Sequence, residues 1–169
     1  MIRKAALGLV FAAAATVPAS ADPATLLGVF QNWSAYSAGS GSELTCYALT
    51  PPRASQPRGA KRAPIYLMVS DWPGRKVKAE PQIGLGYPVK ENAPAALAIG
   101  AAKFAFFARG TGSAWLQQVG DTGRLIDTLG KGVSAVASGV SARGTKTTDT
   151  YSLAGFPDAL AKIHDVCKM

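Results

Sequence analysis

Short strand-like segments, separated by glycine and proline, run through most of this chain and are the feature that most constrains its fold. They begin near Leu26 and end at Leu153, and the 169 residues include 18 glycines and 11 prolines. Many short strands divided by turn residues are typical of antiparallel sandwiches and barrels. We therefore predict a mainly β protein, an antiparallel β-sandwich or jelly-roll-like domain. The predicted strands are Gly28–Tyr36, Leu44–Leu49, Ile65–Ser70, Ala96–Ile99, Lys103–Ala108, Ala114–Gln118, Val133–Ser141 and Lys146–Leu153, with weaker segments at Val77–Ala79 and Ile83–Leu85 on either side of Pro81.

Two helices are predicted within this β-rich pattern, a short internal one and a C-terminal one. The internal helix, Thr122–Lys131, has its large apolar residues at helical spacing and is followed by Gly132, a stop signal. The second helix runs from about Pro157 to Lys168, and proline suits a first helical turn. The apolar stripe of this C-terminal helix contains Phe156, Leu160, Ile163 and Cys167.

The first 21 residues are typical of a secretory signal peptide. Arg3 and Lys4 precede an apolar stretch from Ala5 to Val17, and small residues at positions 19–21 fit a cleavage site. The stretch is too short for a spanning helix, and no second long apolar run follows it. We therefore expect residues 1–21 to be removed, so that the mature chain begins at Asp22. Residues 22–169 are expected to form a single domain without a transmembrane segment, in the periplasm or secreted into the cell envelope.

The two cysteines, Cys46 and Cys167, lie near opposite ends of the mature chain. Two cysteines in an exported domain allow one intramolecular disulfide. Cys46 shares a strand face with Leu44 and Ala48, and Cys167 lies on the apolar stripe of the C-terminal helix, so a bridge would attach that helix to an early strand. Two buried free thiols, or a different partner for Cys46, are the alternatives.

The mature chain is basic. Without Arg3 and Lys4 it has 16 lysines and arginines against 10 aspartates and glutamates, a net charge of +6. Outside the cytoplasm, such a balance fits contact with lipopolysaccharide, an anionic lipid or nucleic acid, or solubility alone. Among these partners we expect the anionic surface of an envelope or host component, and no nucleic acid.

Two segments contain the candidate contacts for an anionic ligand. The segment Pro51–Pro64 has four prolines and no large apolar residue, which predicts an exposed loop. Replacing it with a Gly/Ser linker should shift the free energy of unfolding by less than about 1 kcal/mol. The second segment is a hairpin turn at Arg143-Gly144 with the threonine-rich strand after it, which forms either a solvated sheet face or a polar ligand-binding face. The candidate residues are Arg53, Arg58, Lys61 and Arg62 in the first segment and Arg143 and Lys146 in the second.

The rest of the chain contains no catalytic, metal or cofactor motif. The only histidine, His164, is expected to be a partly exposed surface residue. The run Gly84-Leu85-Gly86 lacks the third glycine and the following helix of a dinucleotide-binding loop. We therefore predict no catalytic or metal-binding residues, no cofactor and no enzyme activity. A glycan hydrolase would need two carboxylates flanking a cleft, and the plausible contributors are Asp71, Glu80, Glu91 and Asp149.

Several stretches of the chain resemble one known family. They are Ile65–Ser70, Glu80–Pro88, Lys103–Phe107, Ala114–Leu116 and, the most specific, Gly139–Leu153. Together they resemble the invasion-associated locus B family of alphaproteobacteria, over most of the mature chain. Members are small exported proteins with a β-sandwich-like domain, named for a role in host-cell entry.

The resemblance implies an exported, non-enzymatic binding or accessory protein acting in host-cell invasion or envelope function. The alternatives are an envelope glycan hydrolase and a structural subunit of an envelope complex. The family supplies no catalytic residues to transfer to this chain. Its members often have a cysteine soon after the tryptophan of the first strand, whereas residues 33–37 here contain none. If the family pattern guides the pairing, Cys167 is the only partner left for Cys46.

Overall fold

The structure is a computed structural model that describes residues 23–90 and 92–169. The predicted signal peptide lies outside the described residues. The strands are β1 (Thr25–Phe30), β2 (Trp33–Ala38), β3 (Thr45–Thr50), β4 (Ala54–Gln56), β5 (Tyr66–Trp72), β6 (Val77–Gly84), β7 (Ala93–Ile99), β8 (Ala102–Arg109), β9 (Ser113–Leu116), β10 (Ser134–Val140) and β11 (Lys146–Ser152). The α-helices are α1 (Thr122–Lys131) and α2 (Phe156–Cys167), and single 3-10 turns lie at Gly41–Glu43, Pro73–Arg75 and Val119–Asp121.

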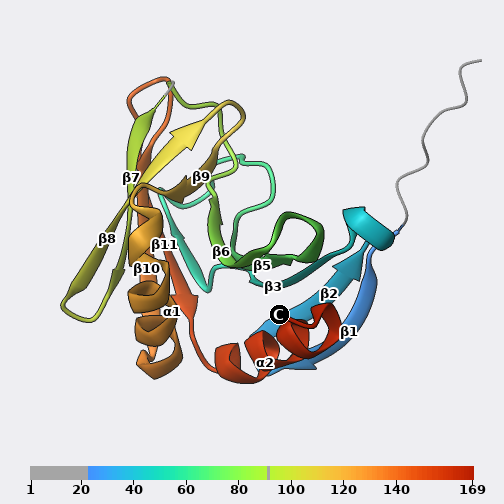
Figure 1. Cartoon of the computed structure of the whole chain (residues 1–169). Coiled ribbons are helices and arrows are strands. Elements are labelled where there is room, and N and C mark those ends of the chain that lie inside the picture. The colour runs from blue at the N-terminus through green and yellow to red at the C-terminus, as the bar shows by residue number, and fades with distance from the viewer. Residues whose placement is uncertain (1–22, 91) are drawn as a thin grey trace, which may run out of the picture.

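All of these strands belong to one antiparallel sheet in the order β1-β2-β3-β5-β6-β9-β8-β7-β10-β11-β4. The predicted mainly β fold with an internal and a C-terminal helix is therefore confirmed. The sheet bends strongly, and Figure 1 shows β1–β3 sweeping away from the group that contains β7, β8 and β10. Hydrogen bonds also connect β2 and β11, which lie near opposite ends of this strand order. The Trp33 indole donates to the Ser152 carbonyl at 3.0 Å, and the Asn32 amide donates to the Ala154 carbonyl at 3.2 Å.

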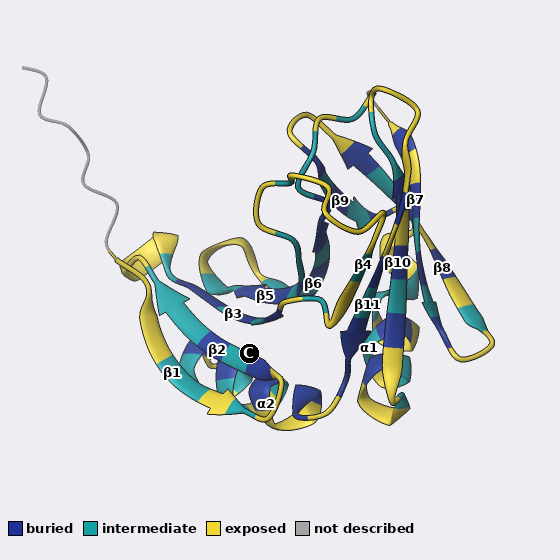
Figure 2. Ribbon diagram, turned by 180° about the vertical axis from the view of Figure 1, so that it is seen from behind, coloured by how far each residue is buried: buried dark blue, intermediate teal, exposed yellow. Residues whose placement is uncertain are grey.

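The core brings together buried side chains from this bent sheet and from both helices. Buried residues alternate with more exposed ones along β8 and β10, as Figure 2 shows. This alternation follows from the two-residue period of a strand, which sends successive side chains to opposite faces. The largest buried side chains are Trp33, Phe104, Phe106, Tyr151 and Phe156. The rings of Trp33 and Phe156, from β2 and α2, lie 4.8 Å apart and join the helix to the sheet.

The two helices cover different parts of the core. Helix α1 has the predicted bounds and buries Leu125 and Leu129. Helix α2 packs against β1, β2, β3 and β5 and buries Phe156, Ala159, Ile163 and Cys167. Figure 1 shows α2 lying alongside β1 and β2. Among the described residues, no helix is long and apolar enough to cross a membrane.

Three strand predictions need correction. The predicted strand Gly28–Tyr36 is instead two antiparallel strands, β1 and β2, which are joined by a turn at residues 31–32. Val77–Ala79 and Ile83–Leu85 are not separate segments, because β6 continues through Pro81. Strand β9 pairs with β6 only from Gln82 onward, so at Pro81 that side of β6 is an edge, where proline is tolerated. Strand β4 was not predicted at all, and it lies within the supposed loop Pro51–Pro64.

Gly155 fixes the entry into α2. Its φ angle is +92°, and an added Cβ would lie 1.8 Å from the carbonyl oxygen of Phe30. We expect Gly155→Ala to lower the free energy of unfolding by about 1–3 kcal/mol, because alanine cannot adopt this conformation without strain. Urea unfolding measures the loss. The matched control is Gly123→Ala in α1, where an added Cβ meets nothing within 4 Å and stability should stay equal or rise. Equal behaviour of the two variants would contradict the role of Gly155.

Candidate functional site: a basic cavity at the β10–β11 turn

A cavity of about 430 Å³ lies where three segments distant in sequence meet. It is lined by residues from 57–62, 86–88 and 141–147. The Ala142 amide donates to the Pro88 carbonyl at 2.8 Å, which attaches the β10–β11 turn to the segment after β6. The Ala63 amide donates to the Gly86 carbonyl at 2.9 Å and fixes the third segment. The predicted hairpin turn at Arg143-Gly144 is present, with Gly144 at a φ angle of +85°.

The floor of this cavity is built on a buried ion pair. Both terminal nitrogens of Arg62 donate to the Asp149 carboxylate, at 2.8 and 2.7 Å, while Nε and Nη2 also donate to the Leu85 carbonyl. The two side chains are 4% and 0% exposed, respectively. Two parallel N–H···O bonds between charged groups are strong and directional. Arg62 therefore holds the 57–62 segment against β11.

Tyr87 adds a second polar contact in the same wall. Its hydroxyl lies 2.6 Å from the Thr147 hydroxyl, and the Arg62 guanidinium lies over its ring, 5.0 Å from the centroid. Burial raises the pKa of Tyr87 above its ordinary value. The hydroxyl therefore stays protonated at neutral pH and is a neutral hydrogen-bonding group in the cavity wall.

The remaining charged side chains that line the cavity are both cationic. Lys61 and Arg143 are exposed, and neither forms an ion pair within residues 23–90 and 92–169. The lining includes no carboxylate, and Asp149 behind it is neutralised by Arg62. The cavity thus has an excess of positive charge beside neutral hydroxyl groups, a combination that suits an anionic group.

The predicted ligand contacts separate into three groups. Lys61, Arg62 and Arg143 meet at this cavity, although 80 residues of sequence divide the first two from the third. Arg53 and Arg58 are exposed but do not line it, and Lys146 lines a neighbouring hollow of about 620 Å³. Arg62 faces inward to Asp149, so it is a structural residue of the wall.

Of two expectations about these segments, one is wrong and the other holds for one face only. Pro51–Pro64 is not an exposed loop throughout, because β4 pairs with β11 and Arg62 is buried. Its replacement by a linker should therefore be costly. The threonine-rich strand β11 is solvated on one face only: Lys146 and Thr148 are exposed, whereas Thr147, Asp149 and Tyr151 are buried in the interior. The sequence offered no local signal for the pairing of Arg62 with Asp149, which depends on the bending of the sheet.

Burial of Tyr151 leads to a prediction about alkaline pH. Burial, and secondarily the neighbouring Asp149, raise the pKa of Tyr151 in the folded protein. The unfolded chain ionises first, near the ordinary value of about 10, so this contribution to stability is full below that pH and is lost as pH rises above it. The free energy of unfolding, measured with urea, should fall more between neutral pH and about pH 11 in the wild type than in Tyr151→Phe. Equal losses would contradict the assignment.

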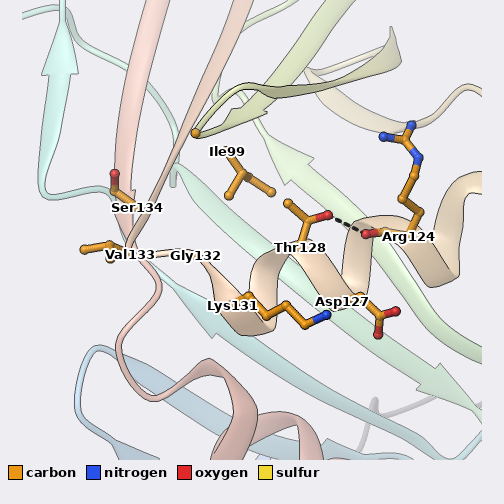
Figure 3. A pocket seen from close by; sticks show the side chains of 9 residues that line it. Ile99, Arg124, Asp127, Thr128, Lys131, Gly132, Val133 and Ser134 are labelled. Carbon is orange, nitrogen blue, oxygen red and sulfur yellow. Dashed lines mark hydrogen bonds between the residues drawn. The ribbon is translucent and has the colours of Figure 1, made fainter.

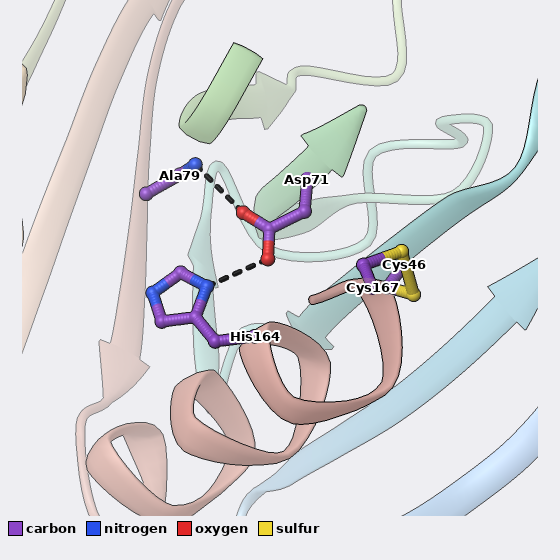
Figure 4. The surroundings of a disulfide bond; sticks show 5 residues. All are labelled: Cys46, Asp71, Ala79, His164 and Cys167. Carbon is purple, nitrogen blue, oxygen red and sulfur yellow. Dashed lines mark hydrogen bonds and ion pairs between the residues drawn. A yellow bond between two sulfur atoms is a disulfide. The ribbon is translucent and has the colours of Figure 1, made fainter. Parts of the chain in front are cut away.

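Cys46 and Cys167 form a disulfide, as predicted, with their Cα atoms 6.0 Å apart. Figure 4 shows the bridge between β3 and α2, close to a second contact between the same helix and the sheet. There, His164 Nδ1 lies 2.6 Å from an oxygen of the buried Asp71, whose other oxygen accepts the Ala79 amide at 2.8 Å. His164 is partly exposed, as predicted, but its bond to Asp71 was not anticipated, because the two are 93 residues apart.

Other hollows on the protein are weaker candidates for a binding or catalytic site than the basic cavity. One of them, with a volume of about 770 Å³, lies along the C-terminal half of α1. Figure 3 shows Arg124, Asp127 and Lys131 along the helix, with Ile99 and Ser134 across from them. Because this lining mixes cations with the carboxylate of Asp127, the hollow is a weaker candidate for an anionic ligand. A groove lined by His164 between α1 and α2 contains no serine, threonine or cysteine in its lining that could act as a nucleophile.

The carboxylates considered for a glycan hydrolase have other partners. Asp71 and Asp149 are buried and bonded to His164 and Arg62, and Glu80 accepts the Trp72 indole N–H at 3.0 Å. Glu91 lies outside the described residues. Within the described part of the chain, no group of three or more His, Cys, Asp or Glu residues could hold a metal ion.

Comparison with known proteins gives one informative match. No family model matches the chain, and no curated protein matches it. The crystal structure of invasion associated protein B from Bartonella henselae is similar, with a TM-score of 0.57 and 12% identity, over 84% of this chain and 98% of that one. At this identity the likeness shows a shared fold. The resemblance seen in the sequence is thus confirmed at the level of the fold.

Proposed function

We propose that this protein is an exported, non-enzymatic binding or accessory protein of the invasion-associated type, whose basic cavity holds an anionic group of an envelope or host component. The fold shared with invasion associated protein B supports a related kind of protein. The Cys46–Cys167 disulfide supports an oxidising location, because such bonds are rare in the cytosol. The signal-peptide pattern of residues 1–21 supports export to the periplasm or beyond.

One observation carries the proposed binding role. Lys61 and Arg143, from separate segments, line one cavity that has no carboxylate in its lining. Bringing like charges together without a partner is electrostatically unfavourable, and a bound anion would relieve that repulsion. The ordered Arg62–Asp149 pair and the Tyr87–Thr147 contact hold the cavity wall in place for such a ligand.

The test is binding of residues 22–169, the expected mature chain, to vesicles of phosphatidylcholine with and without phosphatidylglycerol. We expect binding to the anionic surfaces only, and we expect it to weaken as salt rises. Lys61→Glu with Arg143→Glu should reduce the affinity by about tenfold or more. Lys103→Glu with Lys131→Glu alters the net charge equally at exposed sites outside the cavity. If both double variants lost affinity equally, binding would follow net charge and the cavity would have no role.

A further inference from the structure

A second groove, on the face of the sheet that points away from the core, combines aromatic side chains with cations. It has a volume of about 600 Å³ and lies over β6, β8 and β9, beside the turn at Val119–Asp121. It shares no residue with the basic cavity. We propose that this groove binds an acidic glycan, a sugar chain bearing carboxylate or phosphate groups.

Strand register builds the floor of the groove. Phe107 and Gln82 are each paired with Trp115, on opposite sides of β9. Their neighbours Phe106, Ile83 and Ala114 are buried in the core. Because successive side chains alternate between faces, Phe107 and Trp115 lie together on the outer face, with ring centroids 6.4 Å apart. Both rings are only half-buried, so part of this aromatic surface faces solvent.

Cations surround this floor. The Arg109 guanidinium lies over the Phe107 ring, 4.7 Å from its centroid, a cation–π contact that holds the charge at the groove. Lys76 and Lys78 are exposed along the β6 side. The lining contains one carboxylate, Glu80, against the three cations Lys76, Lys78 and Arg109. The charge balance of the groove therefore favours an anion.

The chemistry of the remaining lining favours a sugar ring. Gln117 and Thr122 supply hydrogen-bonding side chains, while Val119, 81% exposed, extends the apolar surface. A pyranose ring has an apolar C–H face that can lie on an aromatic ring and a rim of hydroxyl groups for polar partners. Pockets of this kind, mostly apolar with a few placed polar groups, are typical of small-ligand sites. Single-stranded nucleic acid would also use aromatic stacking and cations, but the buried disulfide favours a compartment in which glycans are the commoner polymer.

The experiment is a calorimetric titration of the mature, oxidised chain with an oligomer of galacturonic acid. Uncharged dextran, oligothymidylate and polyglutamate are tested in parallel. We expect the acidic glycan to bind and the three others to bind at least about tenfold more weakly. Absent glycan binding would overturn the proposal. Equal binding of dextran would remove the role of charge, a preference for oligothymidylate would point to nucleic acid, and a preference for polyglutamate would point to an acidic peptide; each would overturn it.

Substitutions inside and outside the groove test where the glycan binds. Lys78→Glu with Arg109→Glu should weaken glycan binding by about tenfold or more, and Lys103→Glu with Lys131→Glu should not. Trp115→Ala should also weaken it while Trp115→Phe retains it, each variant first shown to be folded by thermal unfolding. Lys61→Glu with Arg143→Glu should leave glycan binding intact, which keeps this test separate from that of the basic cavity. Loss of glycan binding in that cavity variant, or in the Lys103 and Lys131 control, would contradict the assignment to the groove.

Discussion

Replacing Asp149 with alanine is expected to lower the free energy of unfolding by about 3–5 kcal/mol. The Asp149 side chain is fully buried, and Arg62, its partner, is only 4% exposed. The substitution leaves a guanidinium charge in the interior with the Leu85 carbonyl as its remaining acceptor. An unpaired buried charge loses its hydration without the compensating attraction. Urea unfolding, followed by circular dichroism, measures the change.

Two comparisons separate the buried charge from other causes. Replacing both partners, Arg62→Met with Asp149→Leu, should cost much less than Asp149→Ala alone, because apolar side chains of similar size leave no charge unpaired. Asp165→Ala removes one partner of the exposed Lys168–Asp165 pair and should change stability by less than about 1 kcal/mol. A loss for Asp149→Ala as small as that of Asp165→Ala would contradict the structural role of the pair.

Loss of the disulfide is expected to have an effect of similar size. Cys167→Ser should lower the free energy of unfolding by about 2–5 kcal/mol, mainly because the unfolded chain gains freedom. The bridge joins residues 121 positions apart and holds α2 on β3. A terminal helix without such an attachment tends to fray. The variant should therefore also lose amide-exchange protection in α2 before it loses protection in β8 and β10.

The double variant Cys46→Ser with Cys167→Ser is the control for the disulfide. It should be as unstable as the single variant, since either substitution removes the same covalent link. Thiol labelling of the denatured, unreduced wild type should find no reactive thiol. Two reactive thiols per chain, or a stable single variant beside an unstable double one, would contradict the bridge.

Local patterns were sufficient to predict most of the elements. Thr122–Lys131 has its leucines at helical spacing before a glycine, and the helix has the predicted bounds. Strand β4 was missed because Ala54, Ser55 and Gln56 carry no apolar alternation, and only pairing with β11 makes them a strand. Pro81 gave a false break, since a proline in a strand is compatible with an unpaired edge that the sequence does not reveal.

The candidate site was predictable only in part, for a related reason. Lys61 and Arg143 were recognisable as basic residues in segments rich in turn and polar residues, and both are exposed in the fold. The inward direction of Arg62 was not recognisable, because its partner Asp149 comes from a strand 87 residues away. The same holds for Tyr87 and Thr147, which are 60 residues apart. Long-range polar pairs depend on how the sheet bends.

We propose that the cavity between residues 57–62, 86–88 and 141–147 binds an anionic group. The test is to record amide chemical shifts of isotope-labelled residues 22–169 while soluble short-chain phosphatidylglycerol is added. We predict saturable shifts concentrated at Lys61, Tyr87 and the Ser141–Thr145 turn, absent with the zwitterionic phosphatidylcholine and absent in the Lys61→Glu and Arg143→Glu double variant. Shifts spread evenly over the basic surface, or none in these three segments, would contradict the claim.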